Sequence, residues 1–133
     1  MKQTVTISLI VPVYRVEKYI GRFADSVFSQ SYPHIQFIFV NDGSRDNTLN
    51  ICKELAAKDE RVKYISFSRN FGKEAAMYAG LSNATGDYTC VIDADLQQRP
   101  DVVLEMMQIL DSEPDVDCVA AYQAERKEGK EIS

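Results

Sequence analysis

The sequence has few cysteines, and their spacing excludes two kinds of site. Cys52, Cys90 and Cys118 lie far apart and form no CxxC pair, so neither a disulfide framework nor a zinc site is indicated. Each lies in an apolar stretch, where a free cysteine is expected to be a small buried hydrophobic residue. This usage of cysteine fits a reducing compartment, and we expect the protein to be cytoplasmic.

Basic residues are fewer than acidic residues, and long apolar runs are missing. The net charge of -5 argues against a nucleic-acid partner, because phosphate binding favours a basic face. No apolar run approaches the roughly 20 residues that span a bilayer, and the short polar start of the chain does not resemble a signal peptide. The sequence therefore predicts a soluble single domain over residues 1–133, with a structured core at 5–122 and a frayed tail at 123–133.

Two fingerprints of phosphate binding are also missing. No GxGxxG follows the first apolar run, which argues against a dinucleotide site. The motif GxxxxGK[ST] is also missing, which argues against a P-loop. The stretch NFGKEA contains Gly72 and Lys73, but it lacks the preceding glycine and the following hydroxyl of a P-loop.

Apolar runs that alternate with helical patterns indicate the fold class. The strands are expected at residues 7–13, 37–40, 62–68, 88–92 and 116–122. The helices are expected at 17–28, at 49–56 with Asp46 or Asn47 as N-cap, at 74–83, and from Pro100 to about residue 111. Repeated β-α units predict an α/β fold, a mostly parallel sheet with helices on both faces. Ligands of such sheets bind outside the carboxyl ends of the strands.

The loops that follow the first four strands mix acids with bases. Acids alone would suggest only a metal, whereas acids beside cations suggest a metal bound to an anion such as a phosphate. The charged residues of these loops are Glu17, Asp42, Asp46, Arg69, Lys73, Asp93 and Asp95.

Asp93 and Asp95 form a DxD at the end of the fourth strand. If the strand continued, both side chains would point to the same face. Mg²⁺ and Mn²⁺ prefer oxygen ligands, and such a cation would neutralise a departing diphosphate. An isolated DxD is nevertheless more often a pair of solvated acids at a strand exit.

Asp42 and Gly43 also have two interpretations. The pair DG is a common turn sequence and needs no further role. Alternatively, a carboxylate at the end of this strand can accept a charge-assisted hydrogen bond from a ring N–H of a nucleotide base.

Three stretches in order carry a resemblance to a known family. They are IVPVYRVEKYI, FIFVNDGSRDNT and SRNFGKEAAMYAGLSNATGDYTCVIDADLQQRPDVV. Together they resemble the family 2 glycosyltransferases, which act on nucleotide sugars and have the GT-A fold, over residues 8–110. The RNFG-K and DADLQ-P forms are similar to the branch of dolichol-phosphate mannose synthase and the bactoprenol glucosyltransferases. Arg15 and Val16 depart from the usual pattern, which often has asparagine followed by acids there.

The resemblance implies a set of nucleotide-sugar-binding residues and a metal site. The nucleotide pocket would be lined by Pro12, Val13, Tyr14 and Glu17, with Tyr14 near the base. Asp42 would recognise the base edge, Gly72 would permit close backbone approach, and Lys73 would lie near the base or phosphates. Asp93 and Ala94 would face the ribose and sugar. Asp95, together with Asp93, would hold Mg²⁺ or Mn²⁺.

The resemblance also implies the reaction. A hexosyl group would pass from a nucleotide-diphospho-sugar, with UDP-glucose favoured, to an acceptor, with a polyprenyl (lipid) phosphate favoured over a polysaccharide or other glycan. The chain matches only the N-terminal, nucleotide-binding portion of the family, so no residue is expected to be the catalytic base. A full-length protein would associate with the cytoplasmic face of a membrane, and oligomers are possible.

Two further alternatives start from the residues. A receiver-like regulatory domain is also doubly wound, but it needs an acidic pair after the first strand, where this chain has Val13 and Tyr14. A DxDx[TV] phosphatase would use Asp93 as nucleophile, but its motif follows the first strand and needs Thr or Val at the position of Gln97. The glycosyltransferase hypothesis is therefore preferred.

Overall fold

The computed structural model describes residues 5–28, 32–92 and 101–118. The chain separates into two compact units, Met1–Pro100 and Asp101–Ser133. The first unit contains strands β1 (Ile7–Val13), β2 (Ile35–Asn41), β3 (Val62–Ser66) and β4 (Tyr88–Val91) and helices α1 (Ile20–Phe28), α2 (Thr48–Lys58) and α3 (Lys73–Asn83). The second contains helix α4 (Asp101–Ser112).

The four strands form one parallel sheet in the order β3-β2-β1-β4. Ile7 of β1 pairs with Ile35 of β2 on one side and with Tyr88 of β4 on the other. The chain thus steps outward from β1 to β2 and β3 and then returns to the far side of β1. This change of direction makes the carboxyl ends of β1 and β4 the topological switch point, where open α/β sheets bind their ligands.

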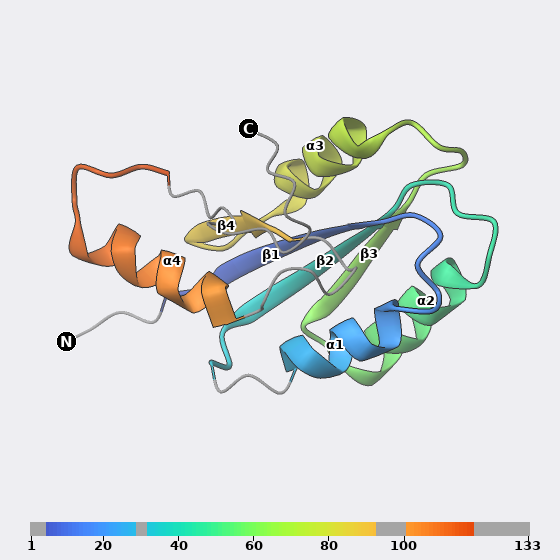
Figure 1. Ribbon diagram of the computed structural model, residues 1–133, viewed down its shortest axis with the longest axis horizontal. Helices are drawn as coiled ribbons and strands as arrows, with labels where there is room; N and C mark the ends of the chain where they lie inside the picture. The colour runs from blue at the N-terminus through green and yellow to red at the C-terminus, as the bar shows by residue number, and fades with distance from the viewer. Residues whose placement is uncertain (1–4, 29–31, 93–100, 119–133) are drawn as a thin grey trace, which may run out of the picture. The chain divides into compact units, whose positions relative to one another are not determined.

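The two faces of the sheet are covered by different helices, with α1 and α2 on one face and α3 on the other (Figure 1). Alternate residues of a strand point to opposite faces. Phe37 and Phe39 therefore face α1, where they make edge-to-face contacts with Phe28 and Phe23 at 4.9 and 6.3 Å between ring centroids. The expected helices on both faces of a parallel sheet are confirmed.

The opposite face of the sheet packs against α3 through a second apolar cluster. Ile10, Ile38, Val40 and Ala76 form its buried centre. A Cβ built on Gly80 of α3 would lie 2.4 Å from Cγ2 of Ile10, so the missing side chain lets the helix approach the sheet closely. The two faces together bury β1 and β2 almost completely, as their unbroken apolar sequences predict.

Several element boundaries differ from those expected. β2 begins at Ile35 rather than at residue 37, because Ile35 and Gln36 pair with the first residues of β1. β3 ends at Ser66 rather than at residue 68, because β2, its neighbour in the described sheet, ends at Asn41. α1 begins at Ile20 rather than at residue 17, since residues 17–19 form a turn in which the N–H groups of Tyr19 and Ile20 both donate to Val16 O.

The strand expected at residues 116–122 is not formed in its described part, residues 116–118. There the N–H of Val116 donates to Glu113 O in a turn that follows α4, 3.0 Å between the two atoms. Residues 119–122 lie outside the described part of the chain, as does Pro100, the expected start of the last helix.

The cysteines are only partly as expected. Cys52 is buried, and burial raises the pKa of its thiol to about 12. Cys90 is half-buried, and burial raises its pKa as well. Cys118 is exposed, because the strand that was to bury it is not formed there. None of the described helices, of which α4 with 12 residues is the longest, has the length and hydropathy of a membrane span.

Candidate nucleotide-binding site

The loops after β1, β2 and β3 lie together at the carboxyl edge of the sheet, at the right of Figure 1. Parallel strands place all these loops at one edge. The loop after β2 lies at the centre, and it is hydrogen-bonded to the loops on both sides. Asp42, the first residue after β2, is 4% exposed, and its N–H donates to Val13 O at 2.9 Å.

The carboxylate of Asp42 binds the loop after β3. Its Oδ1 accepts the N–H of Phe71 at 2.8 Å, and its Oδ2 accepts the N–H of Gly72 at 3.1 Å. Asn70 Nδ2 donates to Oδ2 and to the main-chain oxygen of Asp42, each at 3.2 Å. Asp42 therefore stands at the predicted edge of the sheet, and its side chain ties two loops together.

Gly43 presses against the same loop. Its φ of 76° is in the left-handed region, and a Cβ built on it would lie 2.2 Å from the carbonyl carbon of Arg69. No side chain fits at that distance. A glycine is thus required here for two reasons, its backbone conformation and the close approach of the neighbouring loop.

The loop after β1 is joined to the other side of the β2 loop. The N–H of Arg15 donates to Ser44 Oγ at 2.9 Å, and the N–H of Val16 donates to Thr48 Oγ1 at 3.1 Å. Glu17 Oε1 accepts the N–H of Asn47 at 3.1 Å. Arg15 has a φ of 57°, which non-glycine residues rarely adopt. These contacts fix the loop that the sequence assigned to the nucleotide pocket.

Asp46 contributes to the same junction at the beginning of α2. Its Oδ1 accepts the hydroxyl of Thr48 at 2.5 Å and the N–H of Thr48 at 3.1 Å. Partial desolvation raises the pKa of Asp46, but hydrogen bonds from Thr48 and from the backbone of Glu17 and Asp46 together outweigh it, and the pKa lies below its ordinary value. Asn47 is the N-cap residue but makes no side-chain capping bond, so Asp46 satisfies the first N–H of the helix instead.

The residues at the end of β1 differ in what they present to solvent. Val13 is buried and Pro12 is half-buried, so they shape the edge from within. Tyr14 is 40% exposed, and the guanidinium of Arg15 lies 5.0 Å from its ring centroid. Of the three, Tyr14 has the largest accessible side chain, and its ring can stack on a planar ligand.

Gly72 and Lys73 stand where the β3 loop enters α3. Gly72 has a φ of 101°, and a Cβ built on it would meet no atom within 4 Å. The space beside its Cα is therefore open to a ligand, while its N–H donates to Asp42 and its carbonyl oxygen accepts the N–H of Ala76. Lys73 is exposed and is the first residue of α3, whose amino end carries the positive end of the helix dipole.

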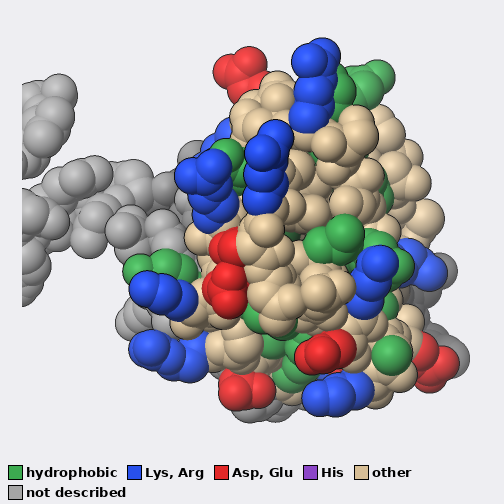
Figure 2. Space-filling model, turned by 90° about the vertical axis from the view of Figure 1, so that its right-hand side faces the viewer, with side chains coloured by type: hydrophobic (Ala, Val, Ile, Leu, Met, Phe, Trp, Pro, Cys, Tyr) green, Lys and Arg blue, Asp and Glu red, His purple; other side chains and the backbone are tan. Residues whose placement is uncertain are grey.

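Figure 2 looks onto this edge and shows Lys and Arg side chains over much of it, with a few carboxylates between them. The chain as a whole is acidic, so this local excess of cations is notable. The exposed cations of the three loops and of the first turn of α3 are Arg15, Lys18, Arg45, Arg69 and Lys73. Such a surface suits a phosphate-containing ligand.

Asp93, Ala94 and Asp95 lie outside the described residues. The residue before them, Ile92, is buried, and its N–H donates to Ile10 O of β1 at 2.9 Å. The DxD therefore follows directly after the strand that borders the topological switch point. Within residues 5–28, 32–92 and 101–118, no three side chains of metal-ligating type come together.

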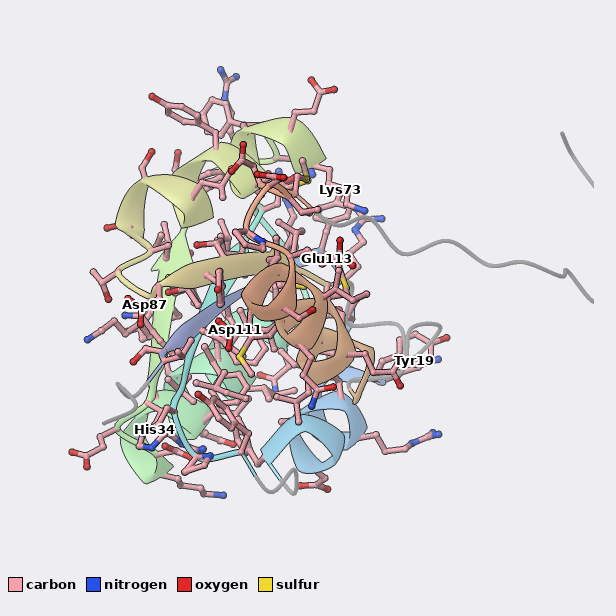
Figure 3. All side chains as sticks on the ribbon, turned by 90° about the vertical axis from the view of Figure 1, so that its left-hand side faces the viewer. Tyr19, His34, Lys73, Asp87, Asp111 and Glu113 are labelled. Atoms are coloured by element: carbon pink, nitrogen blue, oxygen red, sulfur yellow. The ribbon has the colours of Figure 1, made fainter. Side chains whose placement is uncertain are left out.

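Two titratable residues lie at the other edge of the sheet. His34 and Asp87 directly precede β2 and β4, and Figure 3 shows both well apart from Lys73. Asp87 Oδ2 accepts the N–H of Thr6 at 2.9 Å, which is a structural role. His34, the single histidine of the sequence, is exposed and lies away from the candidate site.

Sequence reasoning missed the small polar residues that join the loops. These are Ser44, Thr48 and Asn70. Each lies within one of the three stretches that resemble the family, so its place near the site could have been predicted. Its hydrogen-bond partner could not, because each bond spans 28 to 32 residues of sequence.

Comparison with known proteins shows the family of the chain. The family model described as Glycosyl transferase family 2 matches residues 8–132. A bactoprenol glucosyl transferase of Shigella phage SfX is 43% identical over 105 residues, which cover 77% of this chain and 34% of the relative. Glycosyltransferase GlyA of Streptococcus pneumoniae serotype 4 is 37% identical over 124 residues, which cover 92% of this chain and 18% of the relative.

Solved structures show the same fold. The mannosyltransferase PcManGT from Pyrobaculum calidifontis, in complex with GDP-Man and Mn²⁺, has a TM-score of 0.75 and 24% identity over 90% of this chain and 36% of its own. S. aureus TarS 1-349 in complex with UDP has a TM-score of 0.72 and 24% identity over 95% of this chain and 40% of its own. The expected GT-A type of α/β fold is confirmed.

The chain spans about a third of the length of the phage relative. The match to the family model nevertheless covers almost all of its residues, including every element of the described sheet. The chain therefore belongs to glycosyl transferase family 2.

Proposed function

We propose that this chain binds the nucleotide diphosphate of a nucleotide sugar at the carboxyl edge of its sheet. In a protein of the phage relative's length, a hexosyl group would pass from that donor to a polyprenyl phosphate, with UDP-glucose as the favoured donor. The observation that carries the proposal is the junction of three loops at one basic edge, beside the strand that leads into the DxD.

The comparisons support this choice of ligand and acceptor. PcManGT was solved with GDP-Man and Mn²⁺, and TarS 1-349 was solved with UDP, so both relatives of this fold hold nucleotide diphosphates. The phage relative at 43% identity is a bactoprenol glucosyl transferase, which favours a polyprenyl acceptor. Such an acceptor would bring a protein of that relative's length to a membrane surface, on its cytoplasmic face.

The geometry supports distinct roles for the residues of the site. The accessible ring of Tyr14 would stack on the base, and one free acceptor position on Asp42 would receive its ring N–H. The open space at the Cα of Gly72 and the charge of Lys73 would lie along the diphosphate. Pro12 and Val13 would shape the pocket from within, and Glu17 would hold its wall through Asn47.

The DxD supplies the remaining groups. Asp93 and Ala94 would face the ribose and the sugar, while Asp95, with Asp93, would hold Mg²⁺ or Mn²⁺. Carboxylate oxygens are the donors that these cations prefer, and a bound cation neutralises charge on a departing diphosphate. The chain's own part is to hold the donor in place, since none of its described residues is assigned as the catalytic base.

Calorimetry with UDP and with GDP, each with Mn²⁺, tests this proposal. We expect heat of binding with at least one of them, and a hundredfold excess over Kd should stabilise the fold by about 2.7 kcal/mol. Asp95→Asn should remove the dependence on Mn²⁺. Asp25→Asn, which changes an exposed acid of α1, is the matched control and should bind like the wild type. A folded sample that gives no heat with either nucleotide contradicts the proposal.

A further inference from the structure

The hydrogen bonds of the Asp42 carboxylate run to three consecutive residues of one loop. Oδ1 accepts from Phe71, and Oδ2 accepts from Gly72 and from the side chain of Asn70. A carboxylate offers about four acceptor positions, so three of them are used within the protein. A base N–H can be received only in addition to this set or in exchange for one of its members.

These bonds set the shape of the loop that they reach. Bonds from N–H groups to a carboxylate are charge-assisted, and here they are shielded because Asp42 is 4% exposed. Asn70 binds the main-chain oxygen of Asp42 as well, and Gly43 contacts the carbonyl of Arg69. The loop is therefore held from the β2 side at every residue from 69 to 72.

The same loop carries the groups that the proposed function assigns to the diphosphate. Arg69 lies at its start, the space at the Cα of Gly72 is open, and Lys73 begins α3 directly after it. The guanidinium of Arg69 lies 4.7 Å from the ring centroid of Phe71, so the cation at the loop's start packs on a residue that Asp42 holds. A loss of the bonds to Asp42 would displace these groups together.

We propose that Asp42 is a positioning residue for the diphosphate, which holds residues 69–72 in the conformation that receives the phosphates. This role is separate from its contact with the base, and the inference rests on the proposed function. Asn70 is the second member of the same arrangement, because its side chain braces both the carboxylate and the main chain of Asp42.

The two roles of Asp42 predict different patterns of affinity. If Asp42 acted only on the base, its loss would weaken UMP and UDP by the same factor. If it positions the loop, its loss also reduces the gain in affinity that the second phosphate gives. The quantity to measure is therefore the ratio of the Kd for UMP to the Kd for UDP, each with Mn²⁺, in the 133-residue chain.

The variants are Asp42→Asn and Asn70→Ala, with Asp25→Asn as the control. We expect the ratio to fall roughly tenfold in Asp42→Asn, the equivalent of one charge-assisted hydrogen bond. Asn70→Ala leaves the carboxylate for the base, so its affinity for UMP should stay within about twofold of the wild type while the ratio falls. Amide exchange at Phe71 and Gly72 should be faster in Asp42→Asn. Circular dichroism shows whether each variant is folded. If Asp42→Asn does not fold, the ratio measured in Asn70→Ala decides whether the inference holds.

The possible outcomes distinguish a failure of this inference from a failure of the proposed function. Equal weakening of UMP and UDP in Asp42→Asn, with an unchanged ratio in Asn70→Ala, overturns the inference while the proposed function stands. The inference is also overturned if the ratio of the Kd for UMP to the Kd for UDP is no larger in the wild-type chain than in the two variants. A wild-type chain that binds neither nucleotide contradicts the proposed function itself, and the inference fails with it.

Discussion

At the residue scale, the described part of the site has three backbone conformations that side chains disfavour, at Gly72 and at the two positions Gly43 and Arg15, which lie side by side. Gly43 and Arg15 both have positive φ, and they lie in neighbouring loops that are hydrogen-bonded through Ser44. A glycine adopts this conformation without cost, whereas an arginine does not. The two positions therefore lead to opposite predictions for substitution.

Gly43→Ala should destabilise the protein. The added Cβ meets the backbone of Arg69 at 2.2 Å and also strains a left-handed residue, so we expect a loss of at least about 2 kcal/mol in the free energy of unfolding. Gly21→Ala is the matched control, because a Cβ in this helix meets no atom within 4 Å, and it should stabilise by up to about 1 kcal/mol. Urea unfolding measures both, and equal effects would refute the argument.

Arg15→Asn should stabilise the protein. Asparagine tolerates the left-handed region better than arginine, so we expect a gain of about 0.5–1 kcal/mol, seen as a higher urea midpoint. Arg45→Asn removes a similar exposed charge from the next loop, where φ is not positive, and should show no such gain. A gain of the same size in both variants would assign the effect to charge.

The sequence predicted where the residues that join the loops lie, but not which hydrogen bonds they form. Asp42 and Lys73 were placed at this edge because each lies in a loop after a predicted strand and parallel strands share one edge, whereas Gly72 was assigned to the site by the family resemblance. The structure adds that the carboxylate of Asp42 binds Phe71 and Gly72. No local pattern indicates such a bond, because the two residues are 29 and 30 positions away in the sequence.

At the element scale, the beginning of α2 is tied to the loop after β1 by one hydroxyl. Thr48 Oγ1 accepts the N–H of Val16 and donates to Asp46, and the side chain is fully buried. The same junction anchors the residues in front of α1, since the N–H of Val16 and the side chain of Glu17 bond to the neighbouring loop while Val16 O accepts the N–H groups of Tyr19 and Ile20. Helical periodicity alone predicts the apolar face of a helix better than its first residue.

Thr48→Val should therefore separate the hydroxyl's contribution from that of packing. The variant keeps the shape but leaves the N–H of Val16 without its acceptor, so we expect a loss of about 1–3 kcal/mol in the free energy of unfolding. Thr48→Ser keeps the hydroxyl and should lose less than about 1 kcal/mol. Thermal or urea unfolding compares them, and an equal loss in both would assign the effect to the missing methyl group.

At the scale of the whole molecule, the sheet and its three helices lie within Met1–Pro100. Phe23, Phe28, Phe37 and Phe39 pack on one face, and the cluster around Ile10 and Ala76 packs on the other. Both clusters are formed by elements of the first unit. The expectation of a single domain over residues 1–133 stays a prediction, and removal of the second unit tests it.

A chain that ends at Pro100 should still unfold cooperatively, because the two apolar clusters remain complete. Urea unfolding followed by circular dichroism measures the transition and compares its slope with that of the 133-residue chain. Loss of a cooperative transition would show that residues 101–133 belong to the same folding unit.

The amino-acid pattern by itself determined the succession of the first four strands and the four helices, though not the strand expected after them, and the edge of the sheet at which polar loops gather. The period of apolar residues is a local property that can be read from a short stretch. The carboxyl ends of parallel strands share one edge of a sheet whatever the order of the strands. Only the tertiary structure decided the strand order β3-β2-β1-β4 and the bonds among Asp42, Thr48 and their distant partners. Those depend on which surfaces meet after the chain has folded, and no short stretch of sequence contains both partners.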